Sequence, residues 1–161
     1  MDWHRLEEEV VALVVATEVP PIETRSPVAG KPTFTRGMVE PAVRAVIDVI
    51  RNRVRTPVEV NPQFRDRAIE VVLWPRAFSA VGREDYFARA ASGHWFASHV
   101  ERCLQLWREE WQDTTGGATH YYSPVRMNPP GTAPAWAPAM ERVTVEGVDP
   151  WWFTFLRRGV P

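Results

Sequence analysis

The sequence predicts a mostly helical α+β domain that closes with a small C-terminal β-hairpin. Apolar residues recur at helical spacing in three segments, residues 3–18, 41–55 and 94–112. Near the C-terminus, residues 142–146 alternate like a strand, and residues 151–155 follow after a turn. Because 161 residues with a 45% hydrophobic share can bury one core, we expect a single domain over residues 1–161.

Residues 3–18 form the first expected helix. Asp2 is its candidate N-cap, and Val19-Pro20-Pro21 ends it because proline cannot continue the hydrogen-bond ladder. The expected apolar face comprises Leu6, Val10, Leu13 and Val14, widened by Val11 and Val15. An apolar surface this wide predicts a central helix.

Residues 19–40 are rich in proline and glycine, so we expect a long loop, which in a compact domain is often a functional lid. The next helix is expected over residues 41–55, with Pro41 in its first turn. Its expected apolar stripe is Val43, Val46, Ile47, Ile50 and Val54. Asp48 lies on the polar face, where we expect an ordinary surface pair with Arg51 or Arg44.

Two short helices are expected over residues 66–73, capped by Asp66, and over residues 84–91. The last long helix, residues 94–112, is expected to bury Phe96, Val100, Cys103, Leu104, Trp107 and Trp111. Glycines at 116 and 117 follow its end. Residues 118–138 lack periodicity and predict irregular structure.

The composition excludes several classes of function. A net charge of −1 provides no steering toward nucleic acid or an anionic membrane. The apolar run near the N-terminus is too short to span a bilayer, so we expect no signal peptide and no membrane insertion. Cys103 is the only cysteine, and its helical setting predicts a buried thiol and not a nucleophile.

We expect neither a metal nor a cofactor. His94 and His99 are five residues apart, whereas two ligands on one helical face need a spacing of three or four. The sequence contains no P-loop, no G-x-S-x-G and no dinucleotide-binding fingerprint.

Glu18 is the first candidate for chemistry, because it ends an apolar helix. Apolar neighbours and the negative end of the helix dipole both disfavour its carboxylate anion. They favour the protonated carboxyl that a general acid needs near neutral pH. On position alone, a solvated glutamate at a helix end is the commoner interpretation.

The second candidate is the segment Gly116 to Pro124. Its two glycines allow close approach of the backbone to a ligand, and Thr119, His120, Tyr121 and Tyr122 supply hydrogen-bonding groups and aromatic faces. This combination suits sugars, although a surface loop with aromatic packing has the same pattern. Packing accounts for most of the eight tryptophans, and a minority could stack on a sugar ring.

Several separated segments resemble the SleB-like cell wall hydrolase family. Val15-Ala16-Thr17-Glu18-Val19 is similar to the family's Tyr-Gly-Glu-Ala segment, and residues 45–54 to its Ala-Val-Ile-Leu-Asn-Arg-Val helix. Residues 70–79 resemble Val-Val-Tyr-Gln-x-x-Gln-Phe-Ser. The strongest match is Gly116-Gly117-Ala118-Thr119-His120-Tyr121-Tyr122, followed by Pro134-Ala135-Trp136-Ala137 and a closing hairpin. The resemblance covers roughly residues 10–155.

The resemblance implies a lysozyme-like domain in which Glu18 is the catalytic acid. The residues it places along a glycan-binding groove are Phe78, Ser79, Thr119, His120, Tyr121 and Tyr122. The sequence departs from the family pattern in two places, with Ala77 where the family has Gln and Thr17 where it has Gly. Residues 19–40 look like an insertion relative to that pattern.

The implied substrate is the glycan strand of peptidoglycan, cleaved between N-acetylmuramic acid and N-acetylglucosamine. A hydrolase would need a second carboxylate, for which Glu23, Glu40 and Asp48 are nearest in sequence. A lone acid fits a lytic transglycosylase better, which forms 1,6-anhydro-muramic acid. The alternatives are a muramidase-type hydrolase, a hydrolase of another polysaccharide such as chitin, and a non-catalytic peptidoglycan-binding virion module.

A small monomeric enzyme without a leader matches a bacteriophage endolysin. We expect it to reach the cell wall through a holin, on a virion or by another export route.

Overall fold

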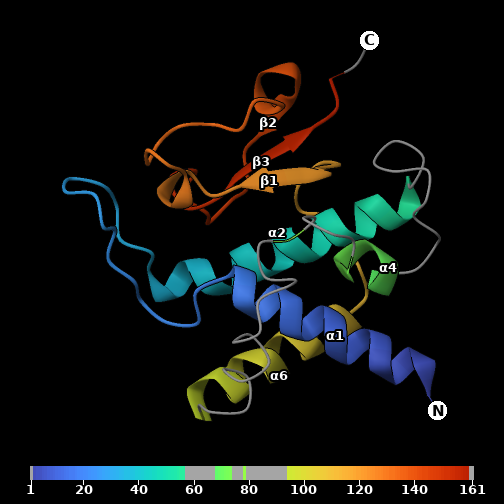
Figure 1. Ribbon diagram of the computed structural model, residues 1–161. Helices are drawn as coiled ribbons and strands as arrows, with labels where there is room; N and C mark the ends of the chain where they lie inside the picture. The colour runs from blue at the N-terminus through green and yellow to red at the C-terminus, as the bar shows by residue number, and fades with distance from the viewer. Residues whose placement is uncertain (1, 57–67, 74–77, 79–93, 160–161) are drawn as a thin grey trace. The chain divides into compact units, whose positions relative to one another are not determined.

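A computed structural model describes residues 2–56, 68–73, 78 and 94–159 (Figure 1). The described residues form helices and one small antiparallel sheet, which confirms the α+β, mostly helical fold class. They divide into two compact units. The first comprises Met1–Pro21 and Arg53–Trp111, and the second comprises Ile22–Asn52 and Gln112–Pro161. The expected helix at 84–91 and the candidate cap Asp66 lie outside the described residues.

The first unit is built from helices α1 (Trp3–Glu18), α4 (Ala68–Leu73) and α6 (His94–Arg108) (Figure 1). Helix α1 has the bounds that its sequence predicts, and the Asp2 carboxylate caps it by accepting from the backbone N–H of Arg5 at 3.2 Å. It packs against both other helices. Helix α6 ends at Arg108, before the expected residue 112.

The run of three glutamates in α1 joins the helices of this unit. Glu7 accepts from the backbone N–H of Ile69, at the start of α4, at 3.2 Å. Glu8 accepts two hydrogen bonds from the Arg108 guanidinium, at 3.0 and 2.8 Å. These bonds outweigh burial and lower the pKa of Glu8. The acidic run therefore supplies tertiary contacts to α4 and α6.

The buried face of α1 confirms part of the predicted apolar surface. Val11, Val14 and Val15 are buried, whereas Leu6, Val10 and Leu13 are only partly buried. The apolar surface is wide enough for either face to pack, and the positions of α4 and α6 decide which one does.

Helix α6 contains the single cysteine, whose predicted burial is confirmed. Cys103 is fully buried, and desolvation raises the pKa of its thiol to about 12. A thiol with this pKa carries almost no thiolate at neutral pH, which agrees with the interpretation that it is not a nucleophile.

The second unit begins with helix α2 (Arg36–Arg55), whose last three residues are assigned to the first unit. The helix starts five residues before the expected residue 41, so Pro41 lies inside it and not in its first turn. Proline has no backbone N–H, so the hydrogen bond from residue 41 to the carbonyl of Gly37 is missing. This loss costs little because Gly37 lies close to the start of the helix. The expected stripe is confirmed at Val43, Val46, Ile47 and Ile50, all buried, while Val54 is partly buried.

The sheet of the second unit has the strand order β1-β3-β2, with both pairs antiparallel. Strands β2 (Glu141–Val143) and β3 (Thr154–Arg157) are the expected hairpin, with bounds slightly shifted from the prediction. Strand β1 (His120–Tyr122) was not expected, because residues 118–138 show no periodicity. Three residues are too few to reveal an alternation in the sequence.

Residues 22–35, which precede α2, pack against and hydrogen-bond to residues 151–153 of the same unit. Phe34 is fully buried and makes edge contacts with Trp152 and Phe153, at centroid distances of 5.4 and 6.2 Å. The indole N–H of Trp151 donates to Ser26, and that of Trp152 donates to the carbonyl of Pro32. The expected 19–40 loop thus ends at residue 35, and two of the eight tryptophans hold it in place.

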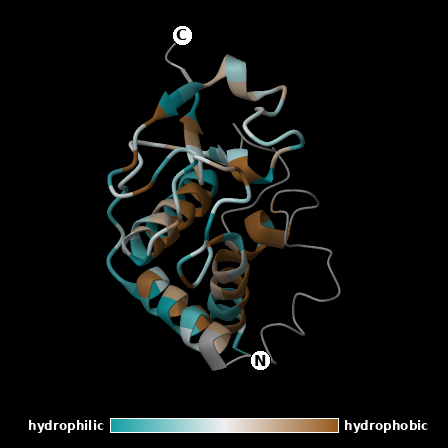
Figure 2. Ribbon diagram, turned by 90° about the vertical axis from the view of Figure 1, so that its left-hand side faces the viewer, coloured by the Kyte–Doolittle hydropathy of each residue, from teal (hydrophilic) through white to brown (hydrophobic). Residues whose placement is uncertain are grey.

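Hydrophobic and hydrophilic residues both occur along the helices, as expected for helices that pack on one side (Figure 2). No helix of the described residues is long and apolar enough to cross a membrane.

Replacing Phe34 by Ala tests this anchoring. Removing a fully buried ring leaves a cavity beside Trp152, so we expect the free energy of unfolding to fall by about 3–5 kcal/mol. Urea denaturation measures it. Ile22→Ala in the same segment is the control, because Ile22 is largely exposed and should change stability little. Equal effects of the two substitutions would contradict the anchoring role of Phe34.

Candidate functional site

Glu18 is the last residue of α1 in the first unit, and only 4% of it is exposed. Val19 caps the helix through its backbone N–H, which donates to the carbonyl of Val15 at 3.2 Å. Val15, Ala16 and Val19 around it are buried as well. Glu18 therefore lies at the C-terminal end of α1, and its neighbours in the sequence include buried apolar residues.

A histidine that sequence reasoning left unassigned fixes this end of the helix. His99 of α6 is buried, and its Nε2 lies 3.0 Å from the carbonyl oxygen of Val19, the residue after Glu18. Burial lowers the pKa of His99, against the opposing effect of its hydrogen bonds to the Val19 and Ala16 carbonyls. A neutral imidazole that donates to Val19 thus holds the backbone next to the candidate acid.

Phe78 also belongs to the first unit, and it is 2% exposed. The guanidinium of Arg53, itself buried, lies 5.3 Å from the centre of its ring, a distance typical of a cation–π contact. Its neighbour Ser79, the other predicted groove residue from this segment, lies outside the described residues.

Thr119, His120, Tyr121 and Tyr122 lie in the second unit, and the segment before them is organised by Asp113. The Asp113 carboxylate accepts from the amide and hydroxyl of Thr115, at 2.8 and 2.7 Å, and from the amide of Gly117, at 2.7 Å. Gly116 and Gly117 both have positive φ, at 65° and 94°. The two glycines are needed here because L side chains rarely adopt this conformation.

Two polar residues of α2 attach this turn to the helix. The Asn52 amide donates to the Asp113 carboxylate at 3.2 Å and to the carbonyl of Ala118 at 2.9 Å. Asp48 accepts from both the amide and the hydroxyl of Thr114. Asp48 is 2% exposed, so the expected surface pair is wrong: the polar side of α2 is covered by residues 113–118.

The pKa of Asp113 reflects two opposing effects in this turn. Partial burial works against ionisation of its carboxyl, but the hydrogen bonds from Thr115, Asn52 and Gly117 together outweigh it and lower the pKa of Asp113. Sequence reasoning missed both Asp113 and Asn52. The signal was an Asp followed by Thr-Thr-Gly-Gly, a composition typical of a turn held by a side-chain carboxylate.

Strand β1 sends the predicted aromatic residues to opposite faces of the sheet. Tyr121 pairs with Phe155 across the strands and contacts Phe155 and Phe153, at centroid distances of 5.6 and 6.0 Å. His120 and Tyr122 point to the other face, because side chains alternate along a strand. The Tyr122 hydroxyl there accepts from Arg142 at 3.2 Å. Residues 120–122 therefore contribute side chains to both faces of the sheet.

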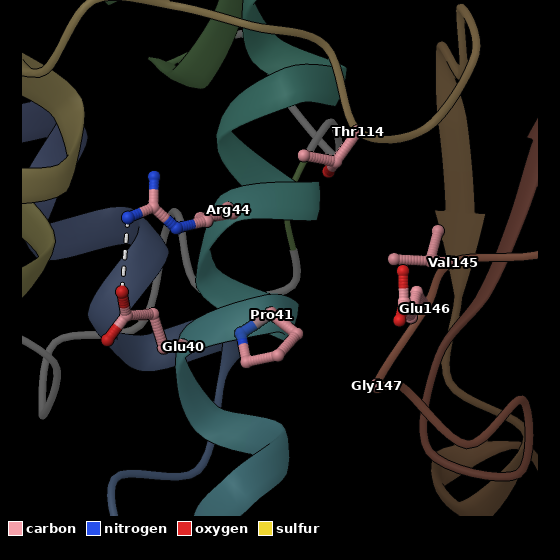
Figure 3. Close-up of a pocket in the computed structure, with 7 residues that line it drawn as sticks. All are labelled: Glu40, Pro41, Arg44, Thr114, Val145, Glu146 and Gly147. Carbon is pink, nitrogen blue, oxygen red and sulfur yellow. Dashed lines mark hydrogen bonds and ion pairs between the residues drawn. The ribbon is translucent and has the colours of Figure 1, made fainter.

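A pocket of about 680 Å³ lies in the second unit, between the start of α2 and residues 145–147 (Figure 3). Glu40 and Arg44, joined by an ion pair at 3.1 Å, and Pro41 line its α2 side. Thr114, Val145, Glu146 and Gly147 complete the lining. None of the predicted substrate-binding residues that the structure describes lines this pocket.

The three carboxylates proposed as possible partners for Glu18 lie in the second unit. Asp48 is engaged with Thr114, and Glu40 with Arg44. Glu23 is exposed in the segment before α2. Among the residues that the structure describes, no group of three or more His, Cys, Asp or Glu is placed to hold a metal ion.

Comparison with known proteins identifies one relationship. A protein-family model described as Cell Wall Hydrolase matches residues 39–153, more than two thirds of the chain. No curated protein and no solved structure matches this chain. The matched range contains the turn at Asp113 and strands β1 and β2. It begins after Glu18 and ends directly before β3.

Asp113→Asn tests the turn before β1. The amide loses the charge and turns its own NH2 group toward two of the four donors, so we expect a lower melting temperature. Because the pKa of Asp113 is lowered, its contribution is present above the unfolded value of about 3.9 and is lost as the pH falls further. The melting temperature of the variant should therefore fall less than that of the wild type as the pH drops below about 4. Thermal melts from about pH 2 to 7 measure this, with exposed Glu110→Gln as control. An unchanged pH profile would contradict the assignment.

His99→Gln tests the anchor beside Glu18. Since the pKa of His99 is lowered in the folded state, the unfolded chain takes up the proton first, and wild-type stability should fall as the pH drops below about 6.5. A glutamine can donate to Val19 without titrating, so its stability should depend less on pH across this range. Urea unfolding at about pH 5 and pH 8 compares the two. Ala97→Gln places a glutamine at an exposed position of the same helix and should keep the wild-type dependence.

Proposed function

This chain belongs to the cell wall hydrolase family, and we propose that it cleaves peptidoglycan glycan strands with Glu18 as the catalytic acid. The family is of the SleB type, whose members act on peptidoglycan. The observation that carries the choice of Glu18 is its burial at the end of α1, beside the buried residues Ala16 and Val19.

In the proposed reaction, Glu18 donates its proton to the oxygen that links N-acetylmuramic acid to N-acetylglucosamine. The bond between this oxygen and C1 of the muramic sugar breaks, and positive charge develops at C1. The C6 hydroxyl of the same sugar then attacks C1 and gives its proton to the Glu18 carboxylate. The products are a 1,6-anhydro-muramic end and a free N-acetylglucosamine end, and no water is consumed.

The engagement of two of the three candidate carboxylates supports this scheme over hydrolysis. A hydrolase uses a second carboxylate as nucleophile or as base for water. Asp48 accepts two hydrogen bonds from Thr114, and Glu40 pairs with Arg44, so both already have structural partners. A lone acid that serves as donor and then as acceptor needs no such partner.

The aromatic strand β1 supplies the proposed contacts to the glycan. His120, Tyr121 and Tyr122 present aromatic rings and polar ring atoms, which suit the alternating CH faces and hydroxyls of a sugar chain. Asp113 and Asn52 hold the turn that precedes the strand, so its residues are positioned before substrate arrives.

Glu18→Gln tests the proposal. The amide has the size of the carboxyl but cannot donate its proton to the leaving oxygen, so we expect peptidoglycan clearing to fall by about 10²- to 10⁴-fold. Clearing in a gel that contains purified sacculi provides the measurement. Glu9→Gln, on an exposed turn of the same helix, should clear sacculi like the wild type. Full activity in the Glu18 variant would show that another group is the acid.

Mass spectrometry of the released muropeptides separates the two reactions. The transglycosylase scheme predicts anhydro-muramic ends, which are lighter by one water than the reducing ends that a muramidase makes. Reducing ends without anhydro product would overturn it, and loss of their formation in Glu23→Gln would then identify the second carboxylate.

A further inference from the structure

Trp136 is an exposed tryptophan that neither the fold nor the reaction accounts for. It is 41% exposed, whereas Trp107 and Trp152 are buried. Trp136 lies directly before the 3-10 helix η2 (Ala137–Ala139), between Pro134 and Pro138. The amide of Ala137 donates to the carbonyl of Pro134, and that of Met140 donates to the carbonyl of Ala137, both at 3.0 Å. The backbone that carries the indole is therefore held in one conformation.

The indole packs against one face of strand β1. The Trp136 ring lies 5.1 Å from the His120 ring and 6.2 Å from the Tyr122 ring, centre to centre, with an angle of 85° to the latter. These are the two motif residues that point away from Tyr121. Thr119 and Arg142 complete the group, through hydrogen bonds to His120 Nδ1 and to the Tyr122 hydroxyl.

This group differs from ordinary hydrophobic packing in its composition. Beneath it, Tyr122 packs with Ala137 and Leu156, which are buried. The indole itself is exposed, the His120 and Tyr122 rings pack against it, and the Arg142 guanidinium donates to the Tyr122 hydroxyl. A flat apolar ring with hydrogen-bonding groups at its edge matches a pyranose, which has an apolar CH face and hydroxyls around its rim.

We propose that Trp136, with His120 and Tyr122, forms a glycan-binding subsite in which one pyranose ring of the peptidoglycan strand stacks on the indole. This inference rests on the proposed function, because that function supplies the polysaccharide. The ring already has a fixed position, so little conformational freedom is lost when the sugar binds. The subsite lies on the opposite face of β1 from Tyr121. Because an indole donates a hydrogen bond but does not transfer a proton near neutral pH, we assign Trp136 to binding and not to the chemical step.

Binding and turnover can be measured separately. Binding to purified sacculi is measured by co-sedimentation in the Glu18→Gln background, where cleavage is suppressed. Trp136→Ala should weaken this binding by about 5- to 10-fold, the loss expected for one aromatic contact. Trp136→Tyr keeps a flat ring and should bind within about twofold of the parent. In the active enzyme, Trp136→Ala should raise the sacculus concentration needed for half-maximal rate and leave the maximal rate largely unchanged.

Two controls separate binding from folding. Trp3→Ala removes a tryptophan that is 63% exposed in the first unit, and it should bind like the parent. Trp136→Met keeps apolar bulk over Tyr122 but has no flat ring, so it should remain folded and still bind weakly. Normal binding by Trp136→Met or by Trp136→Ala would overturn the subsite.

The same measurements distinguish this inference from the proposed function. A wild type that does not cleave sacculi, or a Glu18→Gln variant that retains full activity, contradicts the proposed function. A wild type that cleaves through Glu18, together with a Trp136→Ala variant that binds normally, contradicts only the subsite.

Discussion

The second unit depends on hydrogen bonds from the polar side of α2 to residues 113–118. Asp48 and Asn52 are buried beneath this segment, and Asp113 accepts from three donors within it and from Asn52. Buried polar groups of this kind are costly unless they are satisfied, so the turn has one favourable arrangement. That arrangement decides where strand β1 begins and which of its side chains point to each face.

The same use of polar side chains occurs at the end of α1. His99 holds the carbonyl of Val19, and Glu8 and Glu7 connect α1 to Arg108 and to the start of α4. Each hydrogen bond fixes the position of one residue in or next to α1. Apolar packing alone is less directional and would allow the helix to rotate about its axis or slide along it. Glu18 at the helix end is therefore buried in a defined position, which the role proposed for it requires.

Because side chains alternate along strand β1, the aromatic residues 120–122 have two different structural roles. Tyr121 joins Phe153 and Phe155 on one face, while His120 and Tyr122 support the exposed Trp136 on the other. A motif that appears continuous in the sequence is thus divided by the two-residue period of a strand. The proposed acid and the proposed sugar-stacking ring follow from different parts of the chain, and each has its own test.

The sequence by itself determined the fold class, the bounds of α1, the stripe of α2, the hairpin and the buried thiol, because apolar periodicity and proline placement are local signals. It also indicated Glu18 and the segment at residues 116–122 as the places for chemistry. Only the tertiary structure decided that Asp48 is buried, that residues 120–122 form a strand, and that Trp136 remains exposed. These features depend on residues more than 60 positions apart or on partner strands, and no local pattern encodes such partners.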